Sequence, residues 1–530
     1  MKQNLAIIVM VWAAFLIVRS LAIGPLVFEG IDDANITYAF ADNIANGNGY
    51  VFGKEDAVQV EGSTSLAWTL ILSAATFVGL PLGPSALAIG ALLLLASAIL
   101  CYLVSKESGG SDLAALLTVL LCLSTAGVVE WQALAGMESG LWCSAILFVW
   151  FALSRPLSLF VQCVAFALFV LVRPEALFYA PLIIMMFWIR SVRDRRQTIQ
   201  MVVLLATVIV VASTITLWRL ATFNVPLPNT FYAKVGSLTY NLSNGFRYLG
   251  SVFLAIPMPW ILFAVVLVAD RKRLFRLDPI LVMALITLFL PVITGGDHFT
   301  LGRFSQIHWP FLWIAVVRAG CERIALTKHR WVFVAVLVAF LQIAPSGIIK
   351  SGAPLFHGTG AKVMNEYLIA EQGRKAGRTL STISANTTRP RIGVIAAGGI
   401  ALTYEGPVRD LLGLCNPDVI RHRPSAPSGV PNHDAFSMDL FESANVDAFC
   451  LMPHRNRDSF ALWVRDVANN RNSFENRILK GALLDTGLRS RFVPALLSAH
   501  GDTVSAIVAR KWIYKQGSIV IDSLPWVSPL

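Results

Sequence analysis

The sequence predicts a polytopic α-helical membrane protein that ends in a mixed α/β domain. Of its 530 residues, 56% are hydrophobic and only 14% are charged, whereas a soluble globular domain has about 25% charged residues. Many apolar runs approach the roughly 20 residues that a helix needs to cross a bilayer, and they are continuous rather than alternating. After residue 350 the chain becomes richer in Gly, Pro, Arg, Asn and Asp, and no further run is long enough to span.

The apolar runs before residue 350 predict a transmembrane domain of residues 1–349 with about 11 spans. The first run, at residues 5–28, is too long for the core of a signal peptide, so we expect it to be the first span. Five apolar runs lie between residues 82 and 190, but an even number must cross, because both ends of this interval are predicted to be cytoplasmic. A short run within 142–173 is therefore expected not to cross fully.

Basic residues cluster in short loops between the runs, for example Arg195 and Arg196, the segment 271–273, and Arg323. This is the pattern of cytoplasmic loops, and it accounts for the net charge of +11 without a nucleic-acid partner. It predicts a cytoplasmic N-terminus in a bacterial inner membrane, in contact with its lipids. The first loop, residues 29–65, and the domain of residues 350–530 are then periplasmic.

The second domain shows two buried-strand patterns. Residues 391–400 predict a strand, a glycine turn and the start of a helix, and residues 446–452 predict another strand. The pair Gly398-Gly399 lacks the G-x-G-x-x-G spacing of dinucleotide sites, so we interpret it as a tight turn. About 180 residues are enough for a separate hydrophobic core.

Polar residues gather in the loops predicted to lie outside. Asp32 and Asp33 directly follow the first apolar run, where burying two carboxylates is costly unless they face water, a cation or a substrate. Two neighbouring carboxylates can divide their roles, because like charges close together raise the pKa of one of them. One of them can accept a proton from an attacking hydroxyl, so Asp32 and Asp33 are the candidate catalytic residues.

Cationic side chains in two other outside loops suit a phosphate, since Lys234, His298 and Arg303 carry the required hydrogen-bond donors. Carboxylates, a phosphate site and the adjacent membrane together predict sugar transfer from a polyprenyl phosphate. The full set of candidate substrate-binding residues is Glu61, Asn229, Tyr232, Lys234, Asp297, His298 and Arg303. A divalent cation, Mg²⁺ or Mn²⁺, would suit the carboxylates, although no third ligand is visible.

Each signal also has a structural interpretation. An Asp pair after a span is often a helix cap, and Lys234 and Arg303 could extend to lipid headgroups. For Arg173, Glu175 and Glu138 we favour mutual ion pairs over a catalytic role.

The order of these motifs resembles arabinofuranosyltransferase B and its relatives, GT-C-fold enzymes of mycobacteria with cousins that glycosylate type IV pilin in Pseudomonas. The matching segments are DDANITY (32–38), ADN (41–43), GNG (47–49), VEGSTS (60–65), GMES (136–139), RPE (173–175), PNTFYAK (228–234), GGDH (295–298), IGVIAAGGI (392–400) and VRDLLGL (408–414). The family usually has Tyr where this chain has Asn35, which we expect to alter the acceptor or sugar pocket.

The resemblance implies a GT-C fold, a polyprenyl-phospho-arabinofuranose donor and an acceptor outside the inner membrane. It also implies that Asp32 and Asp33 are the catalytic carboxylates and that Lys234 and His298 lie near the donor phosphate. The C-terminal part looks shorter than in the mycobacterial members, which favours a pilin acceptor over an arabinan.

Three alternatives stay open at this point. The donor could carry aminoarabinose or a hexose destined for lipid A or O-antigen. The protein could be a lipid-linked sugar transporter, although transporters usually show internal repeats and mid-span charges, and no repeat is visible. The C-terminal domain could be a carbohydrate-binding module that selects the acceptor.

Overall fold

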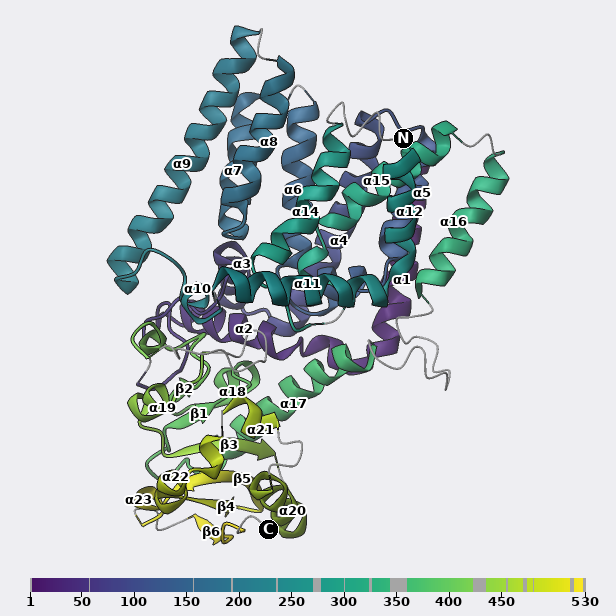
Figure 1. Ribbon diagram of the computed structural model, residues 1–530. Helices are drawn as coiled ribbons and strands as arrows, with labels where there is room; N and C mark the ends of the chain where they lie inside the picture. Colours follow the sequence, from purple (N-terminus) through teal and green to yellow (C-terminus); the bar gives the residue numbers. More distant parts are fainter. Residues whose placement is uncertain are drawn as a thin grey trace.

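The computed structural model describes residues 2–56, 58–155, 157–191, 194–234, 237–269, 278–299, 301–323, 327–343, 360–422, 435–453, 456–469, 474–479, 481–514 and 519–527. It consists of a helical bundle, formed by residues up to 343, and an α/β domain at one end of the bundle, formed from residue 360 onward (Figure 1). The predicted domain boundary at 349/350 and the basic segment 271–273 lie outside the described residues.

The bundle is built from apolar helices that run roughly side by side (Figure 1). These are α1 (Lys2–Ile23), α4 (Leu82–Glu107), α5 (Asp112–Ser124), α6 (Ser139–Ser154), α7 (Leu159–Val172), α8 (Ala176–Ser191), α9 (Arg195–Phe223), α12 (Pro257–Ala269), α14 (Pro279–Ile293), α15 (His308–Arg323) and α16 (Lys328–Ile343). The connecting elements are η1 (Gly24–Phe28), α2 (Asp32–Ala45), α3 (Leu66–Phe77), the π-helix η2 (Glu130–Leu134), α10 (Asn229–Lys234), α11 (Leu238–Ala255) and η3 (Arg303–Ser305).

Three segments among the described residues are long and apolar enough to cross a membrane: Lys2–Phe28, Leu82–Glu107 and Arg195–Phe223. A fourth arises if α11 and α12, which meet at a bend of 102°, are counted as one broken span. Shorter apolar helices pack beside them, and large hydrophobic side chains such as Leu217 and Val268 are exposed on the outside of the bundle. The protein is therefore a multi-pass membrane protein, while the number of about 11 spans stays a prediction.

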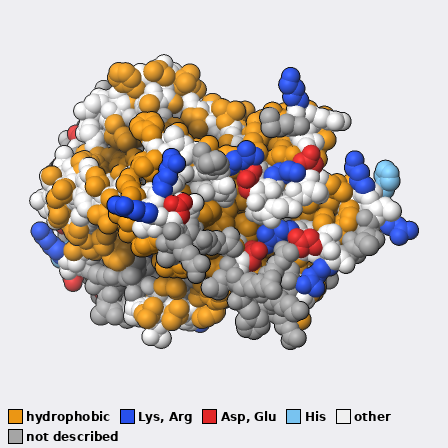
Figure 2. Space-filling view, turned by 90° about the horizontal axis from the view of Figure 1, so that it is seen from above, with side chains coloured by type: hydrophobic (Ala, Val, Ile, Leu, Met, Phe, Trp, Pro, Cys, Tyr) orange, Lys and Arg blue, Asp and Glu red, His pale blue; other side chains and the backbone are white. Residues whose placement is uncertain are grey.

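The end of the bundle opposite the α/β domain carries basic side chains. Figure 2 looks at this end and shows Lys and Arg side chains projecting among hydrophobic ones. α9 and α16 both begin here (Figure 1), with exposed Arg195, Arg196, Lys328 and Arg330 in their first turns. This distribution is the one expected if this end faces the cytoplasm.

The α/β domain is built on a six-stranded mixed sheet of order β2-β1-β3-β5-β4-β6. β1 (Ile392–Val394) pairs in parallel with β2 (Val408–Asp410) and β3 (Ala448–Pro453), whereas β4 (Phe492–Ala499), β5 (Asp502–Ala509) and β6 (Val520–Ser523) pair antiparallel. The helices around it are α17 (Gly360–Ile383), α18 (Gly398–Thr403), η6 (Pro417–Ile420), α19 (Met438–Ala444), α20 (Arg457–Ala468), α21 (Phe474–Ile478), η7 (Ala482–Leu484), α22 (Thr486–Arg491) and α23 (Arg510–Ile513). Both predicted strands are confirmed as β1 and β3. The glycine pair, however, forms the first turn of α18.

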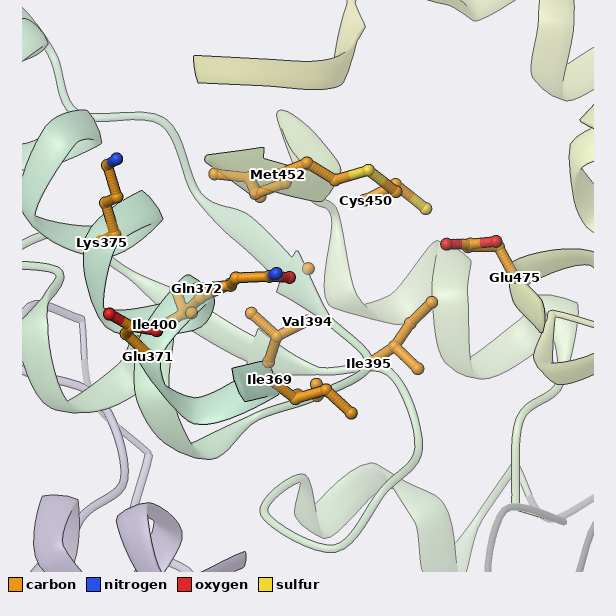
Figure 3. Close-up of a pocket in the computed structure, with 14 residues that line it drawn as sticks. Ile369, Glu371, Gln372, Lys375, Val394, Ile395, Ile400, Cys450, Met452 and Glu475 are labelled. Atoms are coloured by element: carbon orange, nitrogen blue, oxygen red, sulfur yellow. The ribbon is translucent and has the colours of Figure 1, made fainter. Parts of the chain in front are cut away.

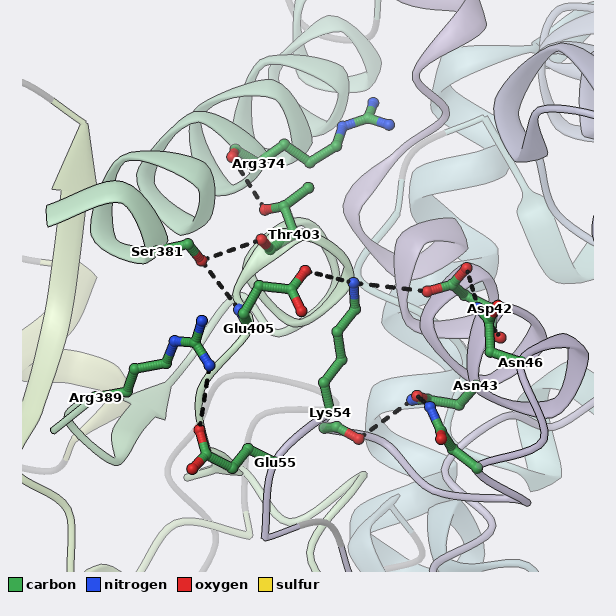
Figure 4. Close-up of polar contacts among 12 residues, drawn as sticks. Asp42, Asn43, Asn46, Lys54, Glu55, Arg374, Ser381, Arg389, Thr403 and Glu405 are labelled. Carbon is green, nitrogen blue, oxygen red and sulfur yellow. Dashed lines mark hydrogen bonds and ion pairs between the residues drawn. The ribbon is translucent and has the colours of Figure 1, made fainter. Parts of the chain in front are cut away.

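The first loop joins the two parts of the molecule. Lys54 pairs with Glu405 of the α/β domain at 2.9 Å and approaches Asp42 of α2 at 3.7 Å (Figure 4). Asp56 accepts hydrogen bonds from Arg391 at 2.6 Å and Arg409 at 2.8 Å. Apolar residues of the loop, among them Phe40, Tyr50 and Phe52, belong to the hydrophobic core of the α/β domain. The loop and the second domain therefore form one packed unit.

Candidate functional site

The two candidate catalytic carboxylates open α2, which lies between the bundle and the α/β domain (Figure 1). Acidic side chains in the first turn of a helix are stabilised by its dipole. Successive residues of a helix point about 100° apart, so the two side chains face different neighbours. Asp32 faces the α/β domain, and Asp33 faces cationic residues from the outside loops.

Asp32 is bound by backbone amides of the second domain. Its Oδ1 accepts a hydrogen bond from the Gly399 N–H at 2.9 Å, and its Oδ2 accepts one from Gly398 at 3.2 Å. Asp32 is only 6% exposed to solvent. Burial raises the pKa of Asp32 to about 6, although the two amides act in the opposite direction.

The close approach of α18 to α2 requires glycine at both positions. A Cβ on Gly398 would lie 1.9 Å from the backbone oxygen of Asp32, and one on Gly399 would lie 2.4 Å from the oxygen of Ala370 in α17. Both distances are far shorter than real Cβ contacts allow. The glycine pair therefore lets α18 bind the Asp32 carboxylate and pack on α17.

Asp33 lies in a cluster of cationic side chains. Its Oδ2 pairs with Nη1 of Arg303 at 2.9 Å, and its side chain is 24% exposed. Burial raises the pKa of Asp33, but Arg303, Lys234 and His298 outweigh it and hold the pKa at about 2. Asp33 is consequently ionised at neutral pH and remains partly accessible.

Arg303 bridges two carboxylates. Its Nε contacts Oδ2 of Asp297 at 2.6 Å while Nη1 contacts Asp33. The guanidinium also lies over the rings of Phe299, at 4.3 Å, and Phe304, at 4.9 Å, where the ring faces attract a cation. Asp297 in turn accepts a hydrogen bond from the backbone N–H of His298 at 2.9 Å. These contacts fix the guanidinium beside Asp33.

Lys234 ends α10 and contributes to the same cluster. Burial lowers the pKa of its ammonium, and the neighbouring Asp33 partly opposes this effect. The structure thus brings together five of the nine predicted site residues: Asp33, Lys234, Asp297, His298 and Arg303.

The other predicted substrate-binding residues hold loops together. Both carboxylate oxygens of Glu61 accept hydrogen bonds from Arg219 of α9, at 2.5 and 2.8 Å. The Asn229 side chain donates to the carbonyls of Gly413, at 2.6 Å, and of Leu414 and Asn416. Tyr232 packs against an apolar cluster of the α/β domain that includes Leu440. Their role in substrate binding stays a prediction.

Sequence reasoning missed two residues near the site. Glu366 of α17 is partly buried, and burial together with Asp33 and Asp32 raises its pKa to about 8. Arg374, further along the same helix, forms an ion pair with the Glu29 carboxylate and donates a hydrogen bond to the Glu29 backbone carbonyl at 2.7 Å. No motif in the sequence marks this segment, and a helical pattern alone does not show which element the helix packs against.

Arg173 forms the predicted ion pairs, with Glu138 and, at 2.8 Å, with Glu175. Arg173 and Arg303 also line one small cavity of about 30 Å³ together with Trp142 and Tyr179. Asn35 is completely buried, and its amide donates to the carbonyls of Glu29 and Ile31 at 3.1 and 2.8 Å. It therefore holds the turn before α2.

The carboxylates do not converge as metal ligands. Within the described residues, no three His, Cys, Asp or Glu side chains are placed to hold one ion. Asp32 is bound by amides, and Asp33 and Asp297 share Arg303. This donor set does not fit a divalent cation.

We expect the Asp32→Asn substitution to remove a pH dependence of stability. Between about pH 4 and pH 6 the folded protein keeps a proton that the unfolded chain has released, so stability falls as the pH rises through this window. Two pKa units correspond to about 3 kcal/mol. Thermal unfolding in detergent from pH 4 to pH 7 should therefore be flatter for Asp32→Asn. Asp42→Asn, which removes an acid of the same helix that does not contact α18, should keep the wild-type slope.

We expect the Glu61→Ala substitution to lower the free energy of unfolding by about 3–5 kcal/mol, because it leaves the buried Arg219 without a partner. Replacing both residues by Met should restore most of the loss. Thermal unfolding of the single and double variants tests this. Equal destabilisation in both would show that the pair itself is not the cause.

No protein-family model and no curated protein matches the chain. Its structure is similar to the oligosaccharyltransferase AglB of Archaeoglobus fulgidus in complex with an inhibitory peptide and a dolichol-phosphate, with 12% identity, a TM-score of 0.54, and coverage of 99% of this chain and 76% of that one. The apo form of the Archaeoglobus enzyme gives 12% identity, a TM-score of 0.54, and coverage of 99% and 75%.

A further similar structure is ArnT from Cupriavidus metallidurans bound to undecaprenyl phosphate, with 14% identity, a TM-score of 0.49, and coverage of 94% of this chain and 97% of that one. At 12% identity, the similarity to the archaeal enzyme establishes the fold of this chain. The chain has the predicted GT-C fold, a polytopic helical bundle with a C-terminal α/β domain.

Proposed function

We propose that the protein is a membrane glycosyltransferase that takes a sugar from a polyprenyl-phosphate donor and transfers it to an acceptor outside the cytoplasm. The observation that carries this proposal is the cluster around Asp33. An ionised, partly exposed carboxylate lies beside Arg303 and Lys234, where an apolar bundle meets a polar domain. A lipid-linked sugar phosphate needs an apolar surface for its lipid, cations for its phosphate and a polar, accessible carboxylate for the acceptor.

In this proposal Asp33 acts on the acceptor hydroxyl, and Asp32 positions it by holding the start of α2 against α18. Arg303 and Lys234 face the phosphate that leaves with the lipid, where fixed positive charge stabilises the developing negative charge. Arg173 lines a small cavity together with Arg303 and is a further cation for the phosphate in this proposal.

Donor binding also adjusts the basicity of Asp33. In the absence of a phosphate, the neighbouring cations hold the pKa of Asp33 at about 2, which makes the carboxylate a weak base. A phosphate bound by the same cations adds negative charge nearby, and this raises the pKa of a carboxylate. Asp33 then becomes a better proton acceptor only once the donor is in place.

The finer assignment rests on the motif order. We propose D-arabinofuranose as the sugar and type IV pilin, or a cell-surface glycan, as the acceptor. Aminoarabinose or a hexose is the alternative sugar. The fold supports a lipid-linked donor, since the similar archaeal oligosaccharyltransferase was solved with a dolichol-phosphate. The basic end of the bundle supports a cytoplasmic N-terminus and a periplasmic α/β domain in the inner membrane.

The test uses the full chain reconstituted in lipid nanodiscs with radiolabelled polyprenyl-phospho-arabinofuranose, polyprenyl-phospho-aminoarabinose and polyprenyl-phospho-hexose in turn. We expect release of polyprenyl phosphate and transfer of label from the arabinofuranosyl donor. Release only from another donor would overturn the sugar assignment. Release from none, together with donor movement across the bilayer of proteoliposomes, would overturn the transferase proposal in favour of a transporter.

A further inference from the structure

A second cavity lies away from Asp33, inside the α/β domain. It has a volume of about 610 Å³ and lies between α17 and the carboxyl ends of β1 and β3 (Figure 3). Sites for small ligands typically measure about 300–1,000 Å³. None of the nine predicted site residues lines it.

The topology of the sheet favours a binding site at this place. After β1 the chain turns to one side, through α18 to β2, whereas after β3 it turns to the other, toward β4. Adjacent parallel strands whose connections diverge in this way leave a crevice at their carboxyl ends, and open α/β sheets bind ligands there.

The backbone of β3 is distorted where it borders the cavity. Cys450 has a φ of +51°, a left-handed conformation that is uncommon for a residue with a side chain. The pairing of β3 with β5 shifts register between Phe449 and Met452. Bulges of this kind redirect side chains and are common beside functional sites. Here Cys450 and Met452 both line the cavity.

The lining combines an aliphatic wall with a few polar groups. Ile369, Val394 and Ile395 form one side, and the side chains of Gln372 and Glu475 extend toward the cavity from opposite sides (Figure 3). Glu371 and Glu475 outnumber the cation Lys375. A carboxamide donates and accepts hydrogen bonds at once, as a peptide group requires. The lining residues described here include no aromatic ring on which a sugar could stack.

We propose that this cavity binds a polypeptide segment that carries an aliphatic side chain next to a basic one, and that this segment belongs to the acceptor. The inference rests on the proposed function and narrows its acceptor to a protein. The position supports it. Ile400 of α18 lines the cavity, while Gly398 and Gly399 at the start of the same short helix bind Asp32. A bound segment would thus lie one short helix away from Asp32 and from the adjacent catalytic Asp33.

The experiment measures retention of the full chain, in nanodiscs, on an array of 15-residue peptides of systematically varied sequence and on a glycan array. We expect retention on peptides with adjacent aliphatic and basic residues. Gln372→Trp, which fills the cavity from an exposed position, should lower it at least tenfold. Thr382→Trp, on an exposed position of α17 two turns beyond the cavity, should not change it. Glu475→Lys should shift the preference from basic toward acidic peptides.

The inference would be overturned if the protein retained no peptide, or if Gln372→Trp retained peptides as well as the wild type does. It would also be overturned if that variant lost retention on glycans rather than on peptides. Release of polyprenyl phosphate from the labelled donor is measured in parallel. A failure of the cavity proposal leaves that release intact, whereas a failure of the proposed function abolishes the release and leaves peptide retention unaffected.

Discussion

The Asp33→Asn substitution is expected to lower kcat for sugar transfer by about 10²–10⁴-fold, the range that a positioned acid or base contributes. The carboxamide has nearly the same shape but carries no charge and cannot accept the proton of the acceptor hydroxyl. Asp33 is the partly exposed carboxylate of the cation cluster, which makes it the side chain that a substrate can reach. Single-turnover transfer from the labelled polyprenyl-phospho-arabinofuranose donor gives the rate of the chemical step.

Asp32→Asn is the matched control, because it makes the same chemical change one residue away. An Asn side chain still offers one oxygen to the α18 amides, so a loss of about one hydrogen bond, roughly 1 kcal/mol, is expected. Such a loss loosens the start of α2 and should reduce the rate by no more than about tenfold. If Asp32→Asn abolished transfer while Asp33→Asn retained it, the roles assigned to the two carboxylates would be reversed.

The membrane class, and the clustering of Asp33, Lys234 and Arg303, could be predicted from the sequence for a simple reason. Asp33, Lys234 and Arg303 each lie in a polar segment between apolar runs, and alternation of the loops predicts that these segments share one side of the membrane. The helical bundle then leaves little freedom in where the loops meet. A strand-turn-helix pattern likewise located β1 and α18, because both elements are short and Gly398 and Gly399 follow the strand after only three residues.

The different environments of the two Asp residues could not be predicted from the sequence. They depend on α18 approaching α2 closely enough for the Gly398 and Gly399 amides to reach Asp32, and this approach is a tertiary contact across 366 positions of sequence. The ion pair of Glu61 with Arg219 could not be predicted for a similar reason, since Arg219 lies near the end of a long apolar helix. Glu366 had no motif at all.

The Arg303→Lys substitution is expected to lower kcat/KM for the donor by about 10²–10³-fold, the usual effect of removing one preorganised charge-stabilising group. Lysine keeps the positive charge but presents a single ammonium on a flexible stem, which cannot bridge two carboxylates as the planar guanidinium does. Arg303 contacts Asp33 through Nη1 and Asp297 through Nε. The variant would keep at most one of these two contacts. Initial rates at varied donor concentration separate the effects on kcat and KM.

Arg318→Lys is the matched control for this prediction. Arg318 is also largely buried and pairs with an aspartate, Asp278, at 2.8 Å, but it lies in the last turns of α15, whereas Arg303 lies just before that helix begins. Both variants should lose a similar amount of thermal stability, because each weakens one buried ion pair. Only Arg303→Lys should also lose transfer activity, since only Arg303 faces the carboxylate that acts on the acceptor. Equal losses of activity in the two variants would mean that Arg303 matters through stability alone, and the phosphate would then have to be bound by Lys234 and Arg173 without it.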